Sequence, residues 1–317
     1  MKKTNILMIF SVLFAIALTS CQKDLLKTVN DGKWNKERNI TEIKFENQIG
    51  LATISRSGET ASITFKYNLD ATGSKKIKIA SLVPSWGATS NAKTGDVLDF
   101  DNANNQAKVV VTGADGTQLE WNINMIPFAE PIKGTWKLSL MMVYGGADGG
   151  AYGGDAWVNM GALISEFLDN KPSCEMDNTY TFEQVGFTES GNSYGNIINN
   201  AGPDGKYADF MWKNGTDNAA RIYRQIPKSG GKWEHDAVTD AYLIKDVNGN
   251  LIISATFRRD VPFEFKPNNK KGYTFTSNTL IFNVKTLGLY VNNWNWLYNG
   301  YDPMIANPWC YCISLIR

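Results

Sequence analysis

Short segments in which apolar and polar residues alternate recur through this chain, and they constrain its fold more than any other feature. They occupy residues 61–67, 76–82, 108–111, 119–123, 241–245 and 251–258. A period of two puts one face of a strand in a core and the other in water. Between the segments stand turn-forming pairs such as Asp115-Gly116 and Asn248-Gly249, which favour hairpins. The pattern predicts an all-β protein.

Two other segments carry weaker local patterns. Between Gly154 and Pro172, apolar side chains recur at helical spacing, namely Trp157, Met160, Leu163, Ile164, Phe167 and Leu168. This spacing predicts one helix that packs against a core. Residues 219–226 and 279–284 are expected to be strands. We therefore expect at most one or two short helices in the chain.

The first twenty residues have the order of parts of a secretory signal peptide. Lys2 and Lys3 precede an apolar run at residues 6–18, and Thr19 and Ser20 stand just before Cys21. The run is shorter than the ~20 residues that a membrane-spanning helix needs. We expect cleavage before Cys21.

Leu18-Thr19-Ser20-Cys21 resembles the bacterial lipobox. The resemblance implies that Cys21 carries lipid and anchors the protein to the outer membrane, the alternative being an ordinary signal peptide with an incidental cysteine. Gln22-Lys23-Asp24 partly resembles the export tag of surface lipoproteins. That likeness implies display on the cell exterior, with retention on the periplasmic side as the alternative.

Length and charge limit the domain count and the partners. Removal of residues 1–20 leaves about 297 residues, enough for two domains. Residues 21–38 are polar and are expected to form a tether. Loss of Lys2 and Lys3 from the 32 basic residues leaves 30 against 31 acidic ones. This balance offers no footprint for nucleic acid and favours a neutral partner.

Residues 39–127 hold about seven predicted strands, typical of an immunoglobulin-like (Ig-like) β-sandwich. The succession Ser85-Trp86-Gly87-Ala88-Thr89, Thr94-Gly95-Asp96 and Asp99-Phe100, followed by 109–121, resembles Ig-like modules of surface lipoproteins in glycan-uptake systems. The resemblance implies a spacer. Pro127 and Pro131 then form a hinge, because proline cannot continue a central strand.

Residues 133–317 are expected to form a larger antiparallel β domain that binds the ligand. Its opening, Gly134-Thr135-Trp136, resembles the first strand of lipocalin-like barrels, and residues 174–182 are similar to the second strand of bacterial lipocalin-like lipoproteins. The resemblance implies a barrel, with a sandwich as the alternative.

Three cysteines follow Cys21, an odd number: Cys174, Cys310 and Cys312. We predict a disulfide between Cys174 and one of the other two, against three free thiols as the alternative. Cys310 and Cys312 make a poor zinc site, because His235 is the sole histidine and lies far away in sequence. No metal or cofactor is predicted.

Catalytic patterns are weak. Gly191-Asn192-Ser193-Tyr194-Gly195 matches the Gly-X-Ser-X-Gly nucleophile elbow, but that elbow needs a helix after it and residues 196–205 are rich in turn formers. Glycoside hydrolysis needs two carboxylates, and no pattern singles out a pair. We predict that the protein is not an enzyme and name no catalytic residue.

Aromatic residues gather near the C-terminus in a stretch without lysine or arginine: Tyr290, Trp294, Trp296, Tyr298, Tyr301, Trp309 and Tyr311. Sugars present apolar C–H faces edged by hydroxyls, so aromatic rings beside amides and carboxylates suit them. The alternative is that these rings fill a core, and we expect them to divide between core and surface. The candidate ligand-binding residues are Trp294, Trp296, Tyr301, Asp302 and Trp309, with Asp148, Tyr152 and Asp155 in a glycine-rich loop.

These features together predict a lipoprotein of the outer membrane, facing the cell exterior, that binds a neutral polysaccharide or oligosaccharide without cleaving it. Its expected partners are an outer-membrane transporter and other surface lipoproteins of a polysaccharide-utilisation system. The alternatives are a lipocalin-like carrier of a small apolar ligand, a glycoside hydrolase, and an adhesive or structural protein.

Overall fold

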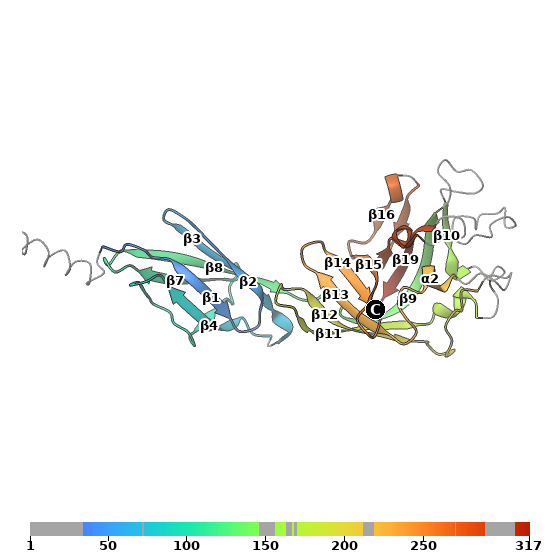
Figure 1. Ribbon diagram of the computed structural model, residues 1–317, viewed down its shortest axis with the longest axis horizontal. Coiled ribbons are helices and arrows are strands. Elements are labelled where there is room, and N and C mark those ends of the chain that lie inside the picture. The colour runs from blue at the N-terminus through green and yellow to red at the C-terminus, as the bar shows by residue number, and fades with distance from the viewer. Residues whose placement is uncertain are drawn as a thin grey trace, which may run out of the picture. The chain divides into compact units, whose positions relative to one another are not determined.

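The computed structural model describes residues 34–71, 73–145, 156–162, 167, 170–211, 219–269, 271–288 and 308–317 (Figure 1). The described chain is all-β, as predicted, and it separates into two compact units, Met1–Ala129 and Glu130–Arg317. Among the helices of these described ranges, none is long and apolar enough to cross a membrane.

The first unit is the predicted β-sandwich. One sheet contains β1 (Ile40–Phe45), β4 (Lys76–Pro84) and β6 (Val97–Asp99), and the other contains β2 (Gln48–Ser57), β3 (Thr60–Asn68), β8 (Gln118–Phe128), β7 (Gln106–Thr112) and β5 (Thr89–Ser90). The 3-10 turn η1 (Leu69–Ala71) follows β3. Strands β3 and β8 pair in parallel, whereas the other pairs are antiparallel.

Aromatic side chains fill the core of the sandwich. Phe45 stacks on Phe65 at 4.1 Å between ring centroids, and Phe100 meets both rings edge-on. The buried Trp121 donates its indole N–H to the Arg38 carbonyl. Residues 35–38, part of the predicted tether, are thus held against the sandwich, and residues 21–33 lie outside the described residues.

The second unit is an eight-stranded antiparallel barrel, the first of the two architectures expected. The strands are β9 (Gly134–Gly145), β11 (Thr179–Phe187), β12 (Ser193–Asn200), β13 (Gly231–Asp236), β14 (Ala241–Lys245), β15 (Leu251–Arg258), β18 (Asn278–Phe282) and β19 (Pro308–Ile316). Each strand pairs with the next, and β19 closes the barrel against β9. Shorter elements decorate this wall: β10 (Ala156–Asn159), η3 (Met160–Ala162), η4 (Pro172–Glu175), α2 (Ala220–Tyr223), β16 (Phe263–Phe265), η5 (Pro267–Asn269), β17 (Tyr273–Phe275) and η6 (Val284–Leu287).

The predicted first strand closes one end of the barrel. Trp136 is buried and donates its indole N–H to the Ile132 carbonyl at 2.6 Å. The Arg317 guanidinium, one residue beyond β19, lies 4.5 Å from the centre of the Trp136 ring and donates to the Lys133 carbonyl. The start of the first strand is therefore bound to the end of the last one.

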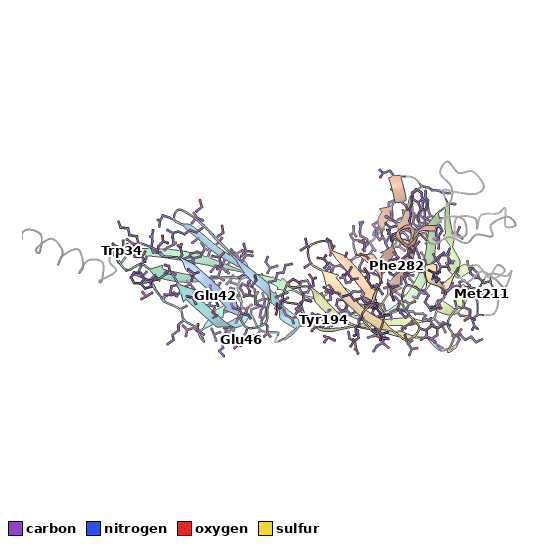
Figure 2. The ribbon with its side chains drawn as sticks, in the orientation of Figure 1. Trp34, Glu42, Glu46, Tyr194, Met211 and Phe282 are labelled. Atoms are coloured by element: carbon purple, nitrogen blue, oxygen red, sulfur yellow. The ribbon has the colours of Figure 1, made fainter. Side chains whose placement is uncertain are left out.

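Aromatic side chains of the described residues pack together in the barrel interior. Tyr180, Tyr223 and Tyr311 are buried there together with Phe282, which is labelled in Figure 2. The interior cavity that these tyrosines line has a volume of about 10 Å³. Such a space holds at most one water molecule and excludes a small apolar ligand.

Two predicted local structures are wrong. Residues 156–159 form β10 rather than a helix, because they pair with the free edge of β9 and Trp157 packs against Tyr144. Residues 220–223 form the helix α2 rather than a strand, with Ile222 and Tyr223 turned into the barrel core. In both cases tertiary packing outweighs the local pattern.

The predicted disulfide is also absent, because Cys174, Cys310 and Cys312 are free thiols. Cys310 and Cys312 alternate with Tyr311 along β19 and therefore point out of the barrel into a separate apolar cluster. Cys174 lies in η4 beside Glu175, whose side chain lines the interior cavity. The thiols therefore belong to different surroundings.

Candidate functional site

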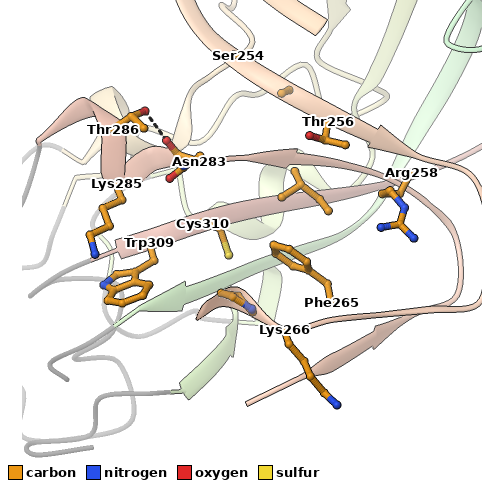
Figure 3. Close-up of a pocket in the computed structure, with 13 residues that line it drawn as sticks. Ser254, Thr256, Arg258, Phe265, Lys266, Asn283, Lys285, Thr286, Trp309 and Cys310 are labelled. Carbon is orange, nitrogen blue, oxygen red and sulfur yellow. Dashed lines mark hydrogen bonds between the residues drawn. The ribbon is translucent and has the colours of Figure 1, made fainter. Parts of the chain in front are cut away.

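An open pocket of about 530 Å³ lies on the outer wall of the barrel (Figure 3). Its floor comes from the outward side chains of consecutive strands, Thr256 on β15, Ile281 on β18 and Cys310 on β19. Their neighbours Phe257 and Phe282 are buried in the barrel core. The period of two along each strand thus separates core residues from pocket residues.

Two short elements form opposite walls of the pocket. Phe265, Lys266 and Pro267 belong to the end of β16 and the start of η5. On the other side stand Asn283 and η6, and the Thr286 hydroxyl donates to the Asn283 carbonyl at 2.7 Å. The volume of the pocket lies within the range typical of small-molecule sites, roughly 300–1,000 Å³.

Trp157 holds the β16–β17 hairpin on the barrel wall. Its indole ring lies 6.1 Å from Phe265, 5.8 Å from Phe275 and 5.2 Å from Tyr144, measured between ring centroids. The indole N–H also donates to the Lys271 carbonyl at 2.9 Å. These contacts fix the wall that carries Phe265, so the pocket is shaped by packed aromatic rings.

Trp309 and Lys285 stand together at one end of the pocket, and Arg258 stands at the other (Figure 3). The Lys285 ammonium lies 3.5 Å from the centre of the Trp309 ring, which is a cation–π contact. Tyr144 meets Trp309 nearly edge-on, at 81° and 6.3 Å. The tryptophan is thus half-buried, and one face of its ring is occupied by a cation.

The other two basic residues of the pocket have acidic partners. Arg258 makes a bidentate pair with Asp260, and its hydrogen bonds lower the pKa of Asp260 to about 2. Lys266 pairs with Glu264 at 2.9 Å, with both side chains half exposed. Within the described ranges, no ion pair involves Lys285. Among the described residues of the pocket, Lys285 is therefore the cation without an acidic partner.

Of the predicted ligand-binding residues, the structure places Trp309 in this pocket. The others lie outside the described residues, namely Asp148, Tyr152, Asp155, Trp294, Trp296, Tyr301 and Asp302, as does the predicted lipid attachment site Cys21. The sequence reasoning missed Thr256, Arg258, Asn283 and Lys285. The alternation of β15 could have marked Thr256 and Arg258 as outward-facing, but not as neighbours of Trp309.

A second polar cluster is buried in the barrel unit. The Glu130 carboxylate accepts hydrogen bonds from the Ser193 hydroxyl, from the Tyr242 hydroxyl at 2.6 Å and from His235 Nδ1 at 3.2 Å. His235 Nε2 lies 2.8 Å from an Asp240 oxygen. Ser193 and His235 face each other across β12 and β13, which the sequence does not reveal.

This cluster does not have the geometry of a nucleophilic site. The Ser193 hydroxyl is buried and bonds to Glu130, whereas a catalytic serine bonds to its histidine base. Ser193 also opens strand β12 and is not followed by a helix. The serine motif therefore forms part of the barrel wall, and it lacks the helix that a nucleophile elbow needs.

The cluster shifts the ionisation of two of its members. Burial would raise the pKa of Glu130, but hydrogen bonds from His235, Ser193 and Tyr242 outweigh burial and hold that pKa below its usual value. Burial would lower the pKa of His235, but its bonds to Glu130 and Asp240 outweigh that effect and raise it. The arrangement favours a buried carboxylate beside a protonated histidine.

Metal coordination has no candidate in the described part of the chain, where no three His, Cys, Asp or Glu residues are grouped to hold an ion.

The chain shows little similarity to known proteins. No protein-family model matches the chain, and no curated protein matches its sequence. Among solved structures, a "putative glycoside hydrolase" from Bacteroides thetaiotaomicron is 14% identical, with a TM-score of 0.25. The match covers 53% of this chain and spans 47% of that protein.

Proposed function

We propose that this protein binds a polysaccharide or oligosaccharide on the outer wall of its barrel and does not cleave it. The observation that carries the proposal is the open pocket of about 530 Å³, which brings Trp309 and Phe265 together with Asn283, Thr256 and Ser254. Aromatic rings suit the apolar faces of sugars, and amide and hydroxyl groups suit their edges. This combination supports a glycan better than a purely apolar ligand.

The carrier alternative is less well supported. A lipocalin-like carrier holds its ligand inside the barrel, and the interior here is filled by Tyr180, Tyr223 and Tyr311 around a space of about 10 Å³. The outer pocket, in contrast, is large enough for a ligand and open to solvent. We therefore place binding outside the barrel.

Binding without cleavage agrees with the state of Asp260 and Glu264, the acidic partners of the pocket cations Arg258 and Lys266 among the described residues. Asp260 is bound by Arg258, and its pKa of about 2 keeps it ionised at neutral pH, so it cannot act as a general acid. Glu264 is engaged by Lys266. A glycosidase needs one carboxyl group that holds a proton and a second that is free to act on the sugar or on water.

We further propose that lipid on Cys21 holds the protein at the outer membrane with both units facing the cell exterior. There it would raise the concentration of a glycan near an outer-membrane transporter and partner surface lipoproteins. The lipobox residues Leu18-Thr19-Ser20-Cys21 support the anchor. Globomycin inhibition of lipoprotein processing, with a Cys21→Ala variant alongside, tests this part separately.

Affinity electrophoresis of residues 22–317 across a panel of polysaccharides tests binding. We expect at least one polymer to retard the protein and the Trp309→Ala variant to lose most of that retardation. The matched control is Tyr194→Ala, because Tyr194 is an exposed aromatic residue on β12, a strand that contributes nothing to the described pocket lining (Figure 2). Absence of retardation by every polymer, or equal loss in both variants, would refute the proposal.

A further inference from the structure

We infer that the sugar bound in this pocket carries a negative charge, a carboxylate or a sulfate, and that Lys285 recognises it. This inference rests on the proposed function and specifies its ligand class. The near-zero net charge of the chain favoured a neutral partner. The local charge of the pocket leads to a different conclusion, because its described lining contains Arg258, Lys266 and Lys285 and no acidic side chain.

The contact between Lys285 and Trp309 is the first argument. A neutral sugar that stacks on a tryptophan needs a free ring face, and here the Lys285 ammonium stands 3.5 Å above the ring centre. Stacking on that face would require the ammonium to leave. The same contact holds the ammonium at the end of the pocket, so the ring positions a cation there.

The state of the other two cations is the second argument. Arg258 is committed to Asp260 through two hydrogen bonds, and Lys266 is paired with Glu264. Lys285 is exposed and, among the described residues, has the Trp309 ring and no carboxylate beside it. An anionic group of the ligand would supply the partner that the described residues do not.

The third argument is that polar groups line the same pocket as Lys285. Asn283 is exposed two residues before it, and Thr286 follows it directly in η6. Thr256 is exposed on the floor. If the ammonium holds the anionic group, the hydroxyl groups of the sugar are left to bond with these amide and hydroxyl groups. The sugar ring would then lie toward Phe265.

Affinity electrophoresis with matched neutral and anionic polymers tests the inference. Dextran is compared with dextran sulfate, and fully methyl-esterified pectin with polygalacturonate, so that each pair differs in charge on one backbone. The variants are Lys285→Met, which keeps the aliphatic stem, and Lys232→Met, which removes the same charge from an exposed site on β13, away from the pocket strands. If Lys285 forms one hydrogen-bonded ion pair with the polymer, Lys285→Met should bind the preferred anionic polymer about tenfold more weakly. The free energy of one hydrogen bond to a charged group corresponds to about that change in affinity.

The outcomes separate the inference from the proposed function. Stronger retardation by the sulfated or the uronate polymer, lost in Lys285→Met and kept in Lys232→Met, supports the inference and identifies the anion. Retardation by neutral polymers alone overturns the inference and leaves the proposed function standing. Equal losses in the two variants would mean diffuse charge attraction and also overturn the inference. No retardation by any polymer overturns both.

Discussion

The buried Glu130 cluster gives the sharpest prediction about stability. Glu130→Ala removes a carboxylate that accepts hydrogen bonds from Ser193, His235 and Tyr242, and also from the backbone N–H of Ile132. Its side chain has no exposure to solvent, and that of His235 is 8% exposed. The substitution leaves three buried polar side chains without their shared acceptor.

The expected loss follows from that geometry. Removal of one partner from a buried, hydrogen-bonded ion pair costs about 3–5 kcal/mol, because the remaining charge stays buried and unpaired. Each hydrogen bond to a charged group contributes about 1.5–3 kcal/mol, and these contributions do not add. We therefore expect Glu130→Ala to lower the free energy of unfolding of the barrel unit by about 3–5 kcal/mol, a large part of the total for a domain.

Urea denaturation of residues 22–317, followed by tryptophan fluorescence, measures this loss. The two units can unfold in separate transitions, so the fit assigns a free energy to each. The control is Glu264→Ala, which removes a carboxylate from a half-exposed pair with Lys266 and should cost about 0–1 kcal/mol. A loss below about 1 kcal/mol for Glu130→Ala, equal to the control, would refute the role given to the cluster.

Three further predictions concern the same unit. The pKa of His235 is raised in the folded state, so its contribution to stability is complete below its ordinary value of 6.5 and is lost as the pH rises through the higher folded value. Urea titrations at pH 6 and pH 9 should therefore show a decrease that is smaller in His235→Gln, and equal decreases would contradict this. Gly195→Ala should destabilise the barrel by about 3 kcal/mol or more, because the new Cβ would stand 1.6 Å from the Glu183 carbonyl oxygen. Gly249→Ala has open space around it and should cost about 1–2 kcal/mol, because Gly249 has a positive φ. Thermal melting compares the two, and similar shifts would count against the packing described. Trp157→Ala should cost about 2–3 kcal/mol and also weaken retardation by the preferred polymer, because the β16–β17 wall loses its support; unchanged retardation would show that the hairpin does not shape the site.

Much of the fold was predictable from periodicity because burial of one strand face leaves a local trace. The strands at residues 241–245 and 251–258 have the predicted bounds. The Gly134-Thr135-Trp136 opening marks the first strand of the barrel. Trp157 was misassigned because spacings of three and four residues fit a helix, whereas its real partners, Tyr144 and Phe275, are distant in sequence.

The candidate site was less predictable because its parts come from four separate segments. Trp309 was identified from its aromatic, asparagine-rich surroundings, and the structure places it in the pocket. Lys285 and Thr256 carry no local signal, since an exposed lysine or threonine on a strand or turn is ordinary. Their role appears only when barrel closure brings β15, β18 and β19 side by side. The Glu130 and His235 cluster was hidden for the same reason.

The most direct test of glycan binding is a crystal structure of residues 22–317 with an oligosaccharide prepared from the polymer that retards the protein most. We predict that the sugar lies in the outer-wall pocket, with its anionic group at the Lys285 ammonium beside Trp309 and its ring toward Phe265. A sugar bound inside the barrel or on the sandwich, with the outer pocket empty, would contradict this account.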